Sequence, residues 1–303
     1  MSDERPVIAV IGATGAQGGA VVNALIASGA FRVRAVTRNP ATYSGPADEV
    51  VAADLADAVS LQEAFVGAYG VFALSNFMGA ELDEFTQGRH AVEAAAKAGV
   101  RHFVWSTQPN VEILSDGAFD VPHFTDKARV DDLVRAAGFT AHTFVIPPFY
   151  FENLVGVMAP QPLPDGGNGW VLPISGDARV VHAASIEDLG GVVAGAFEHP
   201  DAVGAGSYLS SAAVLVSFQD FADTLRSQGH EIGIVEVPPA AYATFYPGAD
   251  EMAQMMGYWA AHTYLGPDGE GQIAAARSVS TTRSTDFKTW AVKHMPKSAG
   301  DTR

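Results

Sequence analysis

The chain has 303 residues, of which 48% are hydrophobic and 17% are charged, a composition that supports a large core and argues against disorder. Acidic residues outnumber basic ones by 34 to 18, so the net charge of −16 argues against a basic face for binding nucleic acid. Because the chain has no cysteine, disulfides, a thiolate nucleophile and cysteine-ligated zinc are excluded.

No targeting or membrane segment is expected. The first residues lack the basic and apolar regions of a signal peptide, and the longest uncharged run, Ala202 to Gln219, is broken by glycine and serine. The histidines show no metal-ligand spacing, so no metal is expected. We therefore expect a cytoplasmic protein without nucleic-acid or membrane partners, and its state as monomer or homodimer stays open.

The first half alternates short apolar runs with helical patterns, which predicts an α/β fold with a doubly wound parallel sheet. The predicted strands are Val7–Ile11, Phe31–Thr37, Val50–Ala53, Val71–Leu74, His102–Trp105 and Thr143–Ile146. The predicted helices are Ala16–Ser28, a helix opened by a capping box at Ser60–Glu63, Glu84–Ala98 and Asp126–Ala137.

After Pro147 and Pro148 the pattern is less regular. The segment 160–169 is rich in proline, glycine and asparagine and predicts a loop. Helix starts are expected at Ser185 and at Ser217, each followed three residues later by aspartate. The tail from Arg277 to Arg303 holds six of the eighteen basic residues against two acidic ones, a pattern typical of a solvated terminus.

A glycine-rich segment follows the first strand directly and leads into the first helix. In Gly12-Ala-Thr-Gly15-Ala-Gln-Gly18, Gly12 allows a tight turn, Gly15 lets the backbone approach a pyrophosphate, and Gly18 permits close helix packing. Amides at a helix N-terminus bind anions. The segment therefore predicts a dinucleotide-binding loop formed by Gly12, Thr14, Gly15, Ala16, Gln17 and Gly18.

The end of the second strand indicates which dinucleotide. An acidic residue there would bind a free ribose 2′-hydroxyl, but this chain has Thr37 and Arg38. A guanidinium forms charge-assisted pairs with phosphate, so the predicted cofactor is NADP(H). Asp54 and Leu55, after the third strand, are candidates for contact with the adenine, although an aspartate that caps the next turn explains Asp54 equally well.

Further candidates follow the other strands, whose carboxyl ends meet at one edge of the sheet. Their apolar and hydroxyl-bearing side chains suit a nicotinamide and a small flat partner. For Phe77 and Phe149, packing in the core is an equally good explanation. The candidates are Ser75, Asn76, Phe77, Ser106, Thr107, Pro147, Phe149 and Tyr150.

Several stretches together resemble the NmrA-like family of atypical short-chain dehydrogenases/reductases. These stretches are residues 12–19, 36–40, 67–77, 99–107, 122–127 and 147–153. The resemblance spans most of residues 7–155 and continues loosely through 185–190. It implies a Rossmann domain, here 1–150, and a smaller α+β domain, 151–303, that is partly interleaved with it and covers the nicotinamide end. The family contains both NADP(H) sensors and reductases.

The resemblance also assigns roles to two charged or titratable residues. Lys127 occupies the position of the lysine that binds the nicotinamide ribose, and His123 stands where reductases of the wider superfamily carry a tyrosine. Both are candidate catalytic residues; a solvated lysine and a capping or packing histidine are the alternatives. The missing tyrosine argues against alcohol–ketone interconversion, which needs a positioned proton donor. Reduction of a quinone or an activated alkene needs less help, because its anionic product is delocalised.

Two functions follow from these observations. One is a reductase that moves hydride from NADPH to a quinone-like or other conjugated small-molecule acceptor. The other is a non-catalytic NADP(H) redox sensor that acts through a protein partner. Lys127, the hydroxyl pair Ser106 and Thr107, and the aromatic residues of the second domain favour the enzyme, whereas the missing tyrosine favours the sensor.

Overall fold

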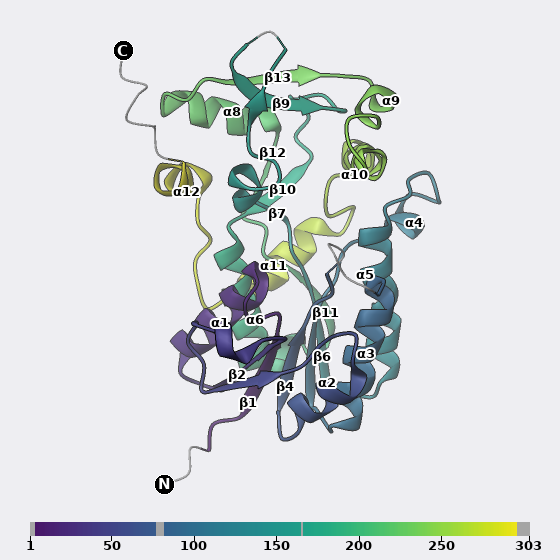
Figure 1. The fold of residues 1–303 in the computed structure, drawn as a ribbon, viewed down its shortest axis with the longest axis vertical. Coiled ribbons are helices and arrows are strands. Elements are labelled where there is room, and N and C mark those ends of the chain that lie inside the picture. Colours follow the sequence, from purple (N-terminus) through teal and green to yellow (C-terminus); the bar gives the residue numbers. More distant parts are fainter. Residues whose placement is uncertain (1–3, 77–81, 165, 296–303) are drawn as a thin grey trace.

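A seven-stranded sheet lies at the centre of the lower half of the molecule in the computed structural model, which describes residues 4–76, 82–164 and 166–295 (Figure 1). The strand order is β11-β6-β5-β4-β1-β2-β3, and all neighbours are parallel. The strands are β1 (Val7–Ile11), β2 (Arg32–Thr37), β3 (Glu49–Ala52), β4 (Gly70–Ala73), β5 (His102–Ser106), β6 (Ala141–Ile146) and β11 (Ala205–Ser210). Because the chain runs outward from β1 and then returns to β4 on the other side, the predicted doubly wound fold is confirmed.

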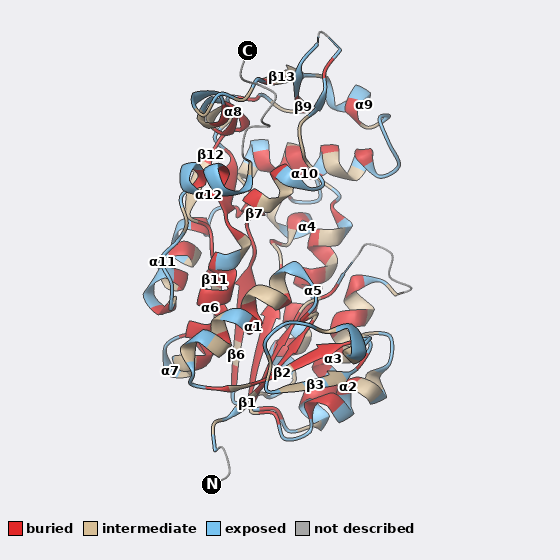
Figure 2. Ribbon diagram, turned by 60° about the vertical axis from the view of Figure 1, so that its left-hand side comes forward, coloured by how far each residue is buried: buried red, intermediate tan, exposed pale blue. Residues whose placement is uncertain are grey.

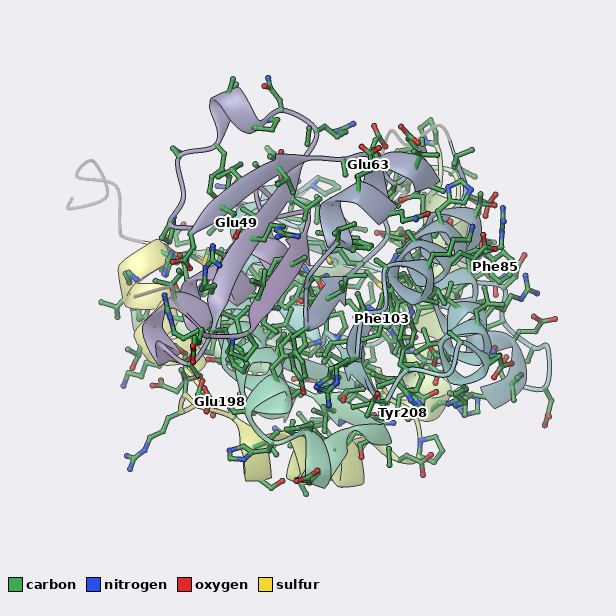
Figure 3. All side chains as sticks on the ribbon, turned by 90° about the horizontal axis from the view of Figure 1, so that it is seen from below. Glu49, Glu63, Phe85, Phe103, Glu198 and Tyr208 are labelled. Carbon is green, nitrogen blue, oxygen red and sulfur yellow. The ribbon has the colours of Figure 1, made fainter. Side chains whose placement is uncertain are left out.

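Helices cover both faces of this sheet. Helices α1 (Ala16–Ser28) and α6 (Ile186–Glu198) pack against each other on one face, and α2 (Ala58–Phe65), α3 (Glu84–Lys97) and α5 (Pro122–Ala136) form a layer on the other. Figure 3 views the molecule from below and shows Glu63 of α2 and Glu198 of α6 far apart, with Phe103 of β5 between them. Both faces of the central strands β1 and β4 are therefore buried, which explains their continuous apolar sequences, whereas the edge strand β3 is partly exposed (Figure 2).

A smaller unit of mixed sheets and helices lies above the carboxyl ends of the strands (Figure 1). Its two three-stranded sheets have the orders β12-β10-β7 and β13-β9-β8. The strands are β7 (Phe149–Tyr150), β8 (Gln161–Pro162), β9 (Asn168–Leu172), β10 (Val181–Ala184), β12 (Val214–Val216) and β13 (Ile232–Glu236). The remaining α-helices are α4 (Val111–Leu114), α7 (Pro200–Val203), α8 (Phe218–Ser227), α9 (Pro239–Tyr242), α10 (Ala249–His262), α11 (Gly269–Val279) and α12 (Phe287–His294). Two 3₁₀ segments, Pro40–Thr42 and Phe151–Val155, complete the described elements.

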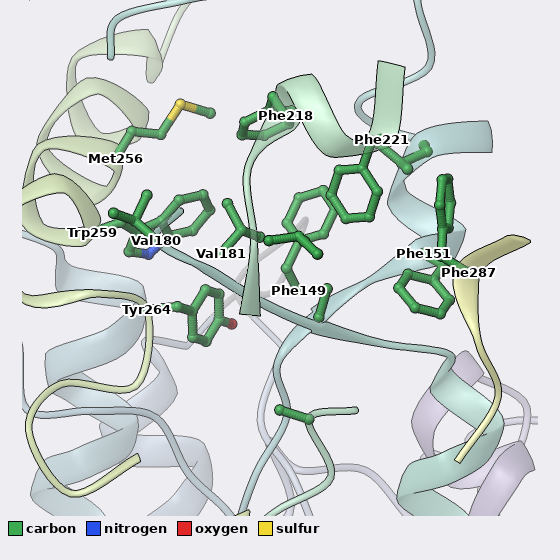
Figure 4. Close-up of a cluster of buried hydrophobic side chains, with 14 of the residues drawn as sticks. Phe149, Phe151, Val180, Val181, Phe218, Phe221, Met256, Trp259, Tyr264 and Phe287 are labelled. Atoms are coloured by element: carbon green, nitrogen blue, oxygen red, sulfur yellow. The ribbon is translucent and has the colours of Figure 1, made fainter. Parts of the chain in front are cut away.

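The core of the upper unit is strongly aromatic (Figure 4). The ring of Phe149 packs against those of Phe218, Phe221 and Trp259, with centroids 5.9, 6.1 and 6.3 Å away. Edge-on and tilted contacts of this kind add to the stabilisation from burial. Met256 and Trp259 of α10 also belong to this core.

The structure corrects several expectations about local elements. Helix α2 is capped by Asp57, whose carboxylate accepts from the amides of Val59 and Ser60, so the capping box predicted at Ser60–Glu63 is wrong. Aspartate caps as well as serine does, and the helix starts earlier as a result. Helix α5 starts at Pro122, four residues before the predicted Asp126, since proline is favoured in the first helical turn.

In the second half, the segment 160–169 contains β8 and the start of β9, not a loop alone. The helix starts at Ser185 and Ser217 are confirmed, and Ser217 forms a capping box with Asp220. Among the described helices, none combines the length and apolar character that a membrane crossing requires.

Candidate functional site

The glycine-rich turn between β1 and α1 has the geometry that its sequence predicts. Gly12 has φ +66°, and its carbonyl accepts from the amide of Gly15 at 2.8 Å. A Cβ at Gly18 would lie 2.2 Å from the carbonyl oxygen of Gly12 and 2.8 Å from that of Ile11. Only glycine therefore fits at position 18, because the helix begins directly against the strand.

The N-terminus of α1 is suited to an anion. Gly15 is its N-cap residue, no side chain caps the helix, and its first turn holds no acidic residue. The first amides of a helix have no partner within it, and the helix dipole places partial positive charge there. A cofactor with a pyrophosphate thus fits this part of the chain, with Gly15, Ala16, Gln17 and Gly18 as the residues that would hold it.

Arg38 lies beside this turn. The amide of Ala13 bonds to the carbonyl of Val36 at 3.4 Å, so the end of β2 adjoins the glycine-rich segment. Thr37 is buried and accepts from the amide of Asn39, whereas Arg38 is exposed and forms no hydrogen bond or ion pair with any described residue. Its guanidinium is in position to meet an anion from solvent.

The two candidates after β3 have local roles of their own. The carboxylate of Asp54 accepts from the amide of Ala56 at 2.9 Å, the turn-capping geometry that was the alternative explanation for this residue. The carbonyl of Leu55 bonds to Nδ1 of His90 at 2.9 Å, and its side chain packs against the core beneath α2 and α3. Contact of either residue with an adenine stays a prediction.

The glycine-rich turn is joined to the end of β5. Ser106 is fully buried, and its hydroxyl donates to Oε1 of Gln17 at 2.8 Å. Thr107, also fully buried, donates its backbone amide to Val145 on β6. Ser106 and Thr107 therefore lie at the same edge as the turn, where three strands end.

The residues after β4 connect to helix α3. The hydroxyl of Ser75 donates to Oε1 of Glu84 at 3.0 Å. The side-chain amide of Gln87 bonds twice to the backbone of Asn76. Its oxygen accepts from the Asn76 amide at 3.0 Å, and its nitrogen donates to the Asn76 carbonyl at 2.9 Å. Phe77 lies outside the residues that the structure describes.

Lys127 is buried and forms an ion pair with the same carboxylate oxygen of Glu84 that Ser75 contacts. Burial lowers the pKa of the Lys127 ammonium, and the charge of Glu84 opposes that shift. Oε2 of Glu84 is buried with no hydrogen-bond partner in the described chain. The pair thus places an ammonium and a carboxylate together at this edge of the sheet.

His123 lies one turn before Lys127 on α5 and is held by the upper unit. Its Nδ1 is 2.5 Å from Oε1 of Glu251 on α10, and its backbone amide donates to the same oxygen at 3.1 Å. Burial lowers the pKa of His123, and the hydrogen bond to Glu251 opposes the shift. A neutral imidazole that donates from Nδ1 to the Glu251 carboxylate carries no proton on Nε2, so this ring can donate from Nε2 only in its imidazolium form.

The residues that follow β6 contact the upper unit in different ways. The carbonyl of Pro147 accepts from the Tyr264 hydroxyl at 3.2 Å, and the ring of Phe149 belongs to the aromatic core of the upper unit. The Tyr150 hydroxyl is buried without a hydrogen-bond partner among the described residues, and burial raises its pKa well above the ordinary value. An unsatisfied buried hydroxyl is costly, which is consistent with a ligand group that completes it.

Three residues at this edge were missed by sequence reasoning: Glu84, Glu251 and Tyr264. Glu251 meets His123 of α5 and Tyr264 meets Pro147 after β6, each more than a hundred residues away in the chain, and no local pattern marks them. Glu84 sits in the first turn of α3, where an acidic residue is favoured simply by the helix dipole. No described group of three or more histidine or acidic side chains is arranged to hold a metal ion.

Comparisons with known proteins agree with this architecture. The oxidoreductase himF of Aspergillus japonicus, described as containing an NmrA-like family domain, is 30% identical over 213 residues. That match covers 64% of each protein, a little less than two thirds of the relative's length. The crystal structure of NmrA, a negative transcriptional regulator, superposes with a TM-score of 0.78 at 21% identity over 95% of both chains.

A second solved structure is an NADPH-dependent quinone oxidoreductase from Escherichia coli in complex with NADPH. It has a TM-score of 0.72 and 19% identity, over 95% of this chain and 99% of that one. At these identities the structures establish likeness of fold. The family model described as the NmrA-like family matches residues 4–291. Because that match extends over nearly the whole sequence, the chain belongs to the NmrA-like family.

Proposed function

We propose that this protein binds NADP(H) and moves hydride from NADPH to a quinone-like or other conjugated acceptor. The observation that carries the cofactor assignment is the turn at Gly12–Gly18, which leaves no room for a Cβ at its last glycine and ends in an uncapped helix N-terminus. Arg38 adds a guanidinium without an ion-pair partner in the described chain at the adjoining end of β2. Charge-assisted bonds from a guanidinium suit the 2′-phosphate that distinguishes NADP(H) from NAD(H).

The bound nicotinamide would supply the hydride, and the chain's own groups would position it and handle the proton. Lys127, paired with Glu84, would bind the ribose hydroxyls of the nicotinamide half, as the family resemblance implies. His123, whose Nδ1 is held by Glu251, would donate the proton from its imidazolium form. Proton transfer from a weak donor suffices when the product anion is delocalised, which is why a quinone or enone fits better than a ketone.

Names of the similar proteins support a redox function. The relative himF is described as an oxidoreductase, and a protein of the same fold is an NADPH-dependent quinone oxidoreductase. The second candidate, a regulator that responds to the nicotinamide state, is favoured by the fold of NmrA and by His123, whose ring is tied to α10. In a regulator this tie would couple the nucleotide site to the upper unit.

The discriminating experiment follows NADPH oxidation by stopped-flow absorbance with a panel of quinones and enones. A reductase shows saturable, acceptor-dependent oxidation. His123→Phe then leaves NADPH affinity nearly unchanged and lowers turnover by about 10²-fold or more if the imidazole donates the proton. His123→Gln, which retains a hydrogen-bonding group toward Glu251, separates loss of that tie from loss of the proton donor.

A silent acceptor panel contradicts the reductase. The regulator then requires different affinities for NADP⁺ and NADPH, because a ligand pair with equal affinity for every conformation shifts no equilibrium. Calorimetry of both nucleotides measures this difference. Equal affinities together with a silent panel would contradict both functions.

The choice of cofactor is tested by Arg38→Ala. Loss of a charge-assisted contact costs about 1.5–3 kcal/mol, so NADPH affinity should fall roughly ten- to a hundredfold, whereas NADH affinity should change little. Arg89→Ala is the matched control, because Arg89 is an exposed arginine on α3 paired with Glu93. Equal losses for NADPH and NADH would contradict the assignment of Arg38.

A further inference from the structure

A cavity lies against α6, outside the candidate site. Its volume is about 400 Å³, and it lies among α6, the end of β11, α11 and the segment that follows α11. These elements contact one another and are seen together in Figure 2. None of the residues that line it belongs to the dinucleotide site described above. Its volume is within the range of small-molecule sites.

Two arginines at this cavity lack the partners that most arginines of this chain have. Arg277 and Arg283 both line it. Neither forms an ion pair with a described residue, in a chain where acidic residues outnumber basic ones by 34 to 18. The one hydrogen bond of Arg277 goes to the carbonyl of Ala213, and Arg283 forms none within the described ranges. Two positive charges therefore line one cavity, and neither is paired with a carboxylate of the described residues.

The single carboxylate of the lining, Asp188, forms no ion pair with Arg277 or Arg283 and is engaged by Thr285 instead. Both of its oxygens accept from the amide of Thr285 at 3.2 Å, and one also accepts from the Thr285 hydroxyl. Burial raises the pKa of Asp188 to about 6. Asp188 thus anchors the segment after α11 to the start of α6.

An unsatisfied polar group in the lining points independently to a ligand. Ser211 is 5% exposed, and its hydroxyl has no hydrogen-bond partner in the part of the chain that the structure covers. Further hydroxyl-bearing residues, Ser210, Ser280 and Thr282, also line the cavity. A buried hydroxyl without a partner is costly unless something completes it.

We propose that this cavity binds a small polar anion through a carboxylate or phosphate group, held by Arg277, Arg283 and the hydroxyl of Ser211. Guanidinium groups bind both kinds of oxyanion through paired, charge-assisted hydrogen bonds. The surrounding hydroxyls suit a hydrophilic ligand and not an apolar one. The site uses the first two basic residues of the C-terminal tail, and it is separate from the proposed dinucleotide site.

The test titrates the full-length protein with citrate and with inorganic phosphate by calorimetry, which separates a carboxylate ligand from a phosphate one. We expect one of the two probes to bind, and Arg283→Ala to weaken its affinity at least tenfold. Arg283 is the primary variant because it makes no hydrogen bond whose loss would disturb the fold. Arg89→Ala, on the opposite face of the sheet, should bind as the unaltered protein does.

A second variant separates binding from stability. Ser211→Ala should weaken the same probe severalfold and should not lower the melting temperature of the ligand-free protein, because it removes a hydroxyl that has no partner there. The proposal is overturned if neither probe binds, or if Arg283→Ala binds as well as the unaltered protein. It is also overturned if binding is lost only in Arg38→Ala, since the probe would then occupy the nucleotide site.

Discussion

At the scale of single residues, the most perturbed carboxyl group near the candidate site is Asp131. It lies one helical turn after Lys127 and is 3% exposed. Burial raises its pKa to about 7, although hydrogen bonds from Tyr208 and Thr107 act in the opposite direction. The folded state therefore binds this proton more tightly than the unfolded chain, with a pKa of 3.8, does. Stability from this group is complete below about pH 4 and is lost as the pH rises through 7.

The variant Asp131→Asn keeps a neutral, hydrogen-bonding side chain at every pH. We expect its free energy of unfolding at pH 8 to exceed that of the parent by up to about 4 kcal/mol, and its decline between pH 4 and 7 to flatten. Urea unfolding at several pH values measures both effects. The control is Asp132→Asn at an exposed neighbour, which should change stability by less than about 0.5 kcal/mol. A variant less stable than the parent at pH 8 would contradict the expectation.

At the scale of elements, the turn between β1 and α1 leads into two adjacent glycines, Gly18 and Gly19, whose substitution by alanine should have opposite effects on stability. A Cβ at Gly18 would lie 2.2 Å from the carbonyl oxygen of Gly12, whereas a Cβ at Gly19 finds its nearest atom 3.6 Å away. Gly18→Ala should lower the free energy of unfolding by at least about 1–3 kcal/mol through overpacking. Gly19→Ala should raise it by up to about 1 kcal/mol through helix propensity.

Thermal unfolding without nucleotide, followed by NADPH titration, checks this pair. Gly18→Ala should also weaken NADPH binding. The added Cβ forces α1 away from β1, and this changes the position of the first amides of α1, which would bind the pyrophosphate. Equal changes in stability and in NADPH affinity for the two substitutions would contradict this expectation, because only Gly18 lies at the close approach of α1 and β1.

At the scale of the whole molecule, the second half of the chain completes the core of the first. Strand β11 pairs with β6, and α6 packs on α1 with Leu189 and Val193 fully buried in the same cluster as Ile8. A fragment of residues 1–150 would lose this strand and this helix. We expect it to lack a cooperative unfolding transition by circular dichroism, in contrast to the full chain. A fragment that unfolds cooperatively and binds NADPH would contradict this dependence.

The alternation of elements and the glycine-rich turn could be predicted because their signals are local. An apolar strand, a turn that needs glycine and an amphipathic helix are each specified within about fifteen residues. All six predicted strands of the first half are present: Val7–Ile11 has the predicted bounds, and no end of the others is shifted by more than two residues. Strand β11 could not be placed from its own sequence, since its pairing with β6 depends on the course of the sixty residues between them.

By itself, the sequence determined the family, the doubly wound sheet and the position of the turn at Gly12–Gly18, because glycine geometry and hydrophobic periodicity operate over short distances. Only the tertiary structure decided that Lys127 pairs with Glu84, that His123 is held by Glu251, and that Phe149 packs in the aromatic core of the upper unit. The first two contacts join residues 43 and 128 positions apart, and burial at them lowers the pKa of Lys127 and of His123. Charge and burial depend on which side chains the fold brings together, and no local pattern in the chain records that.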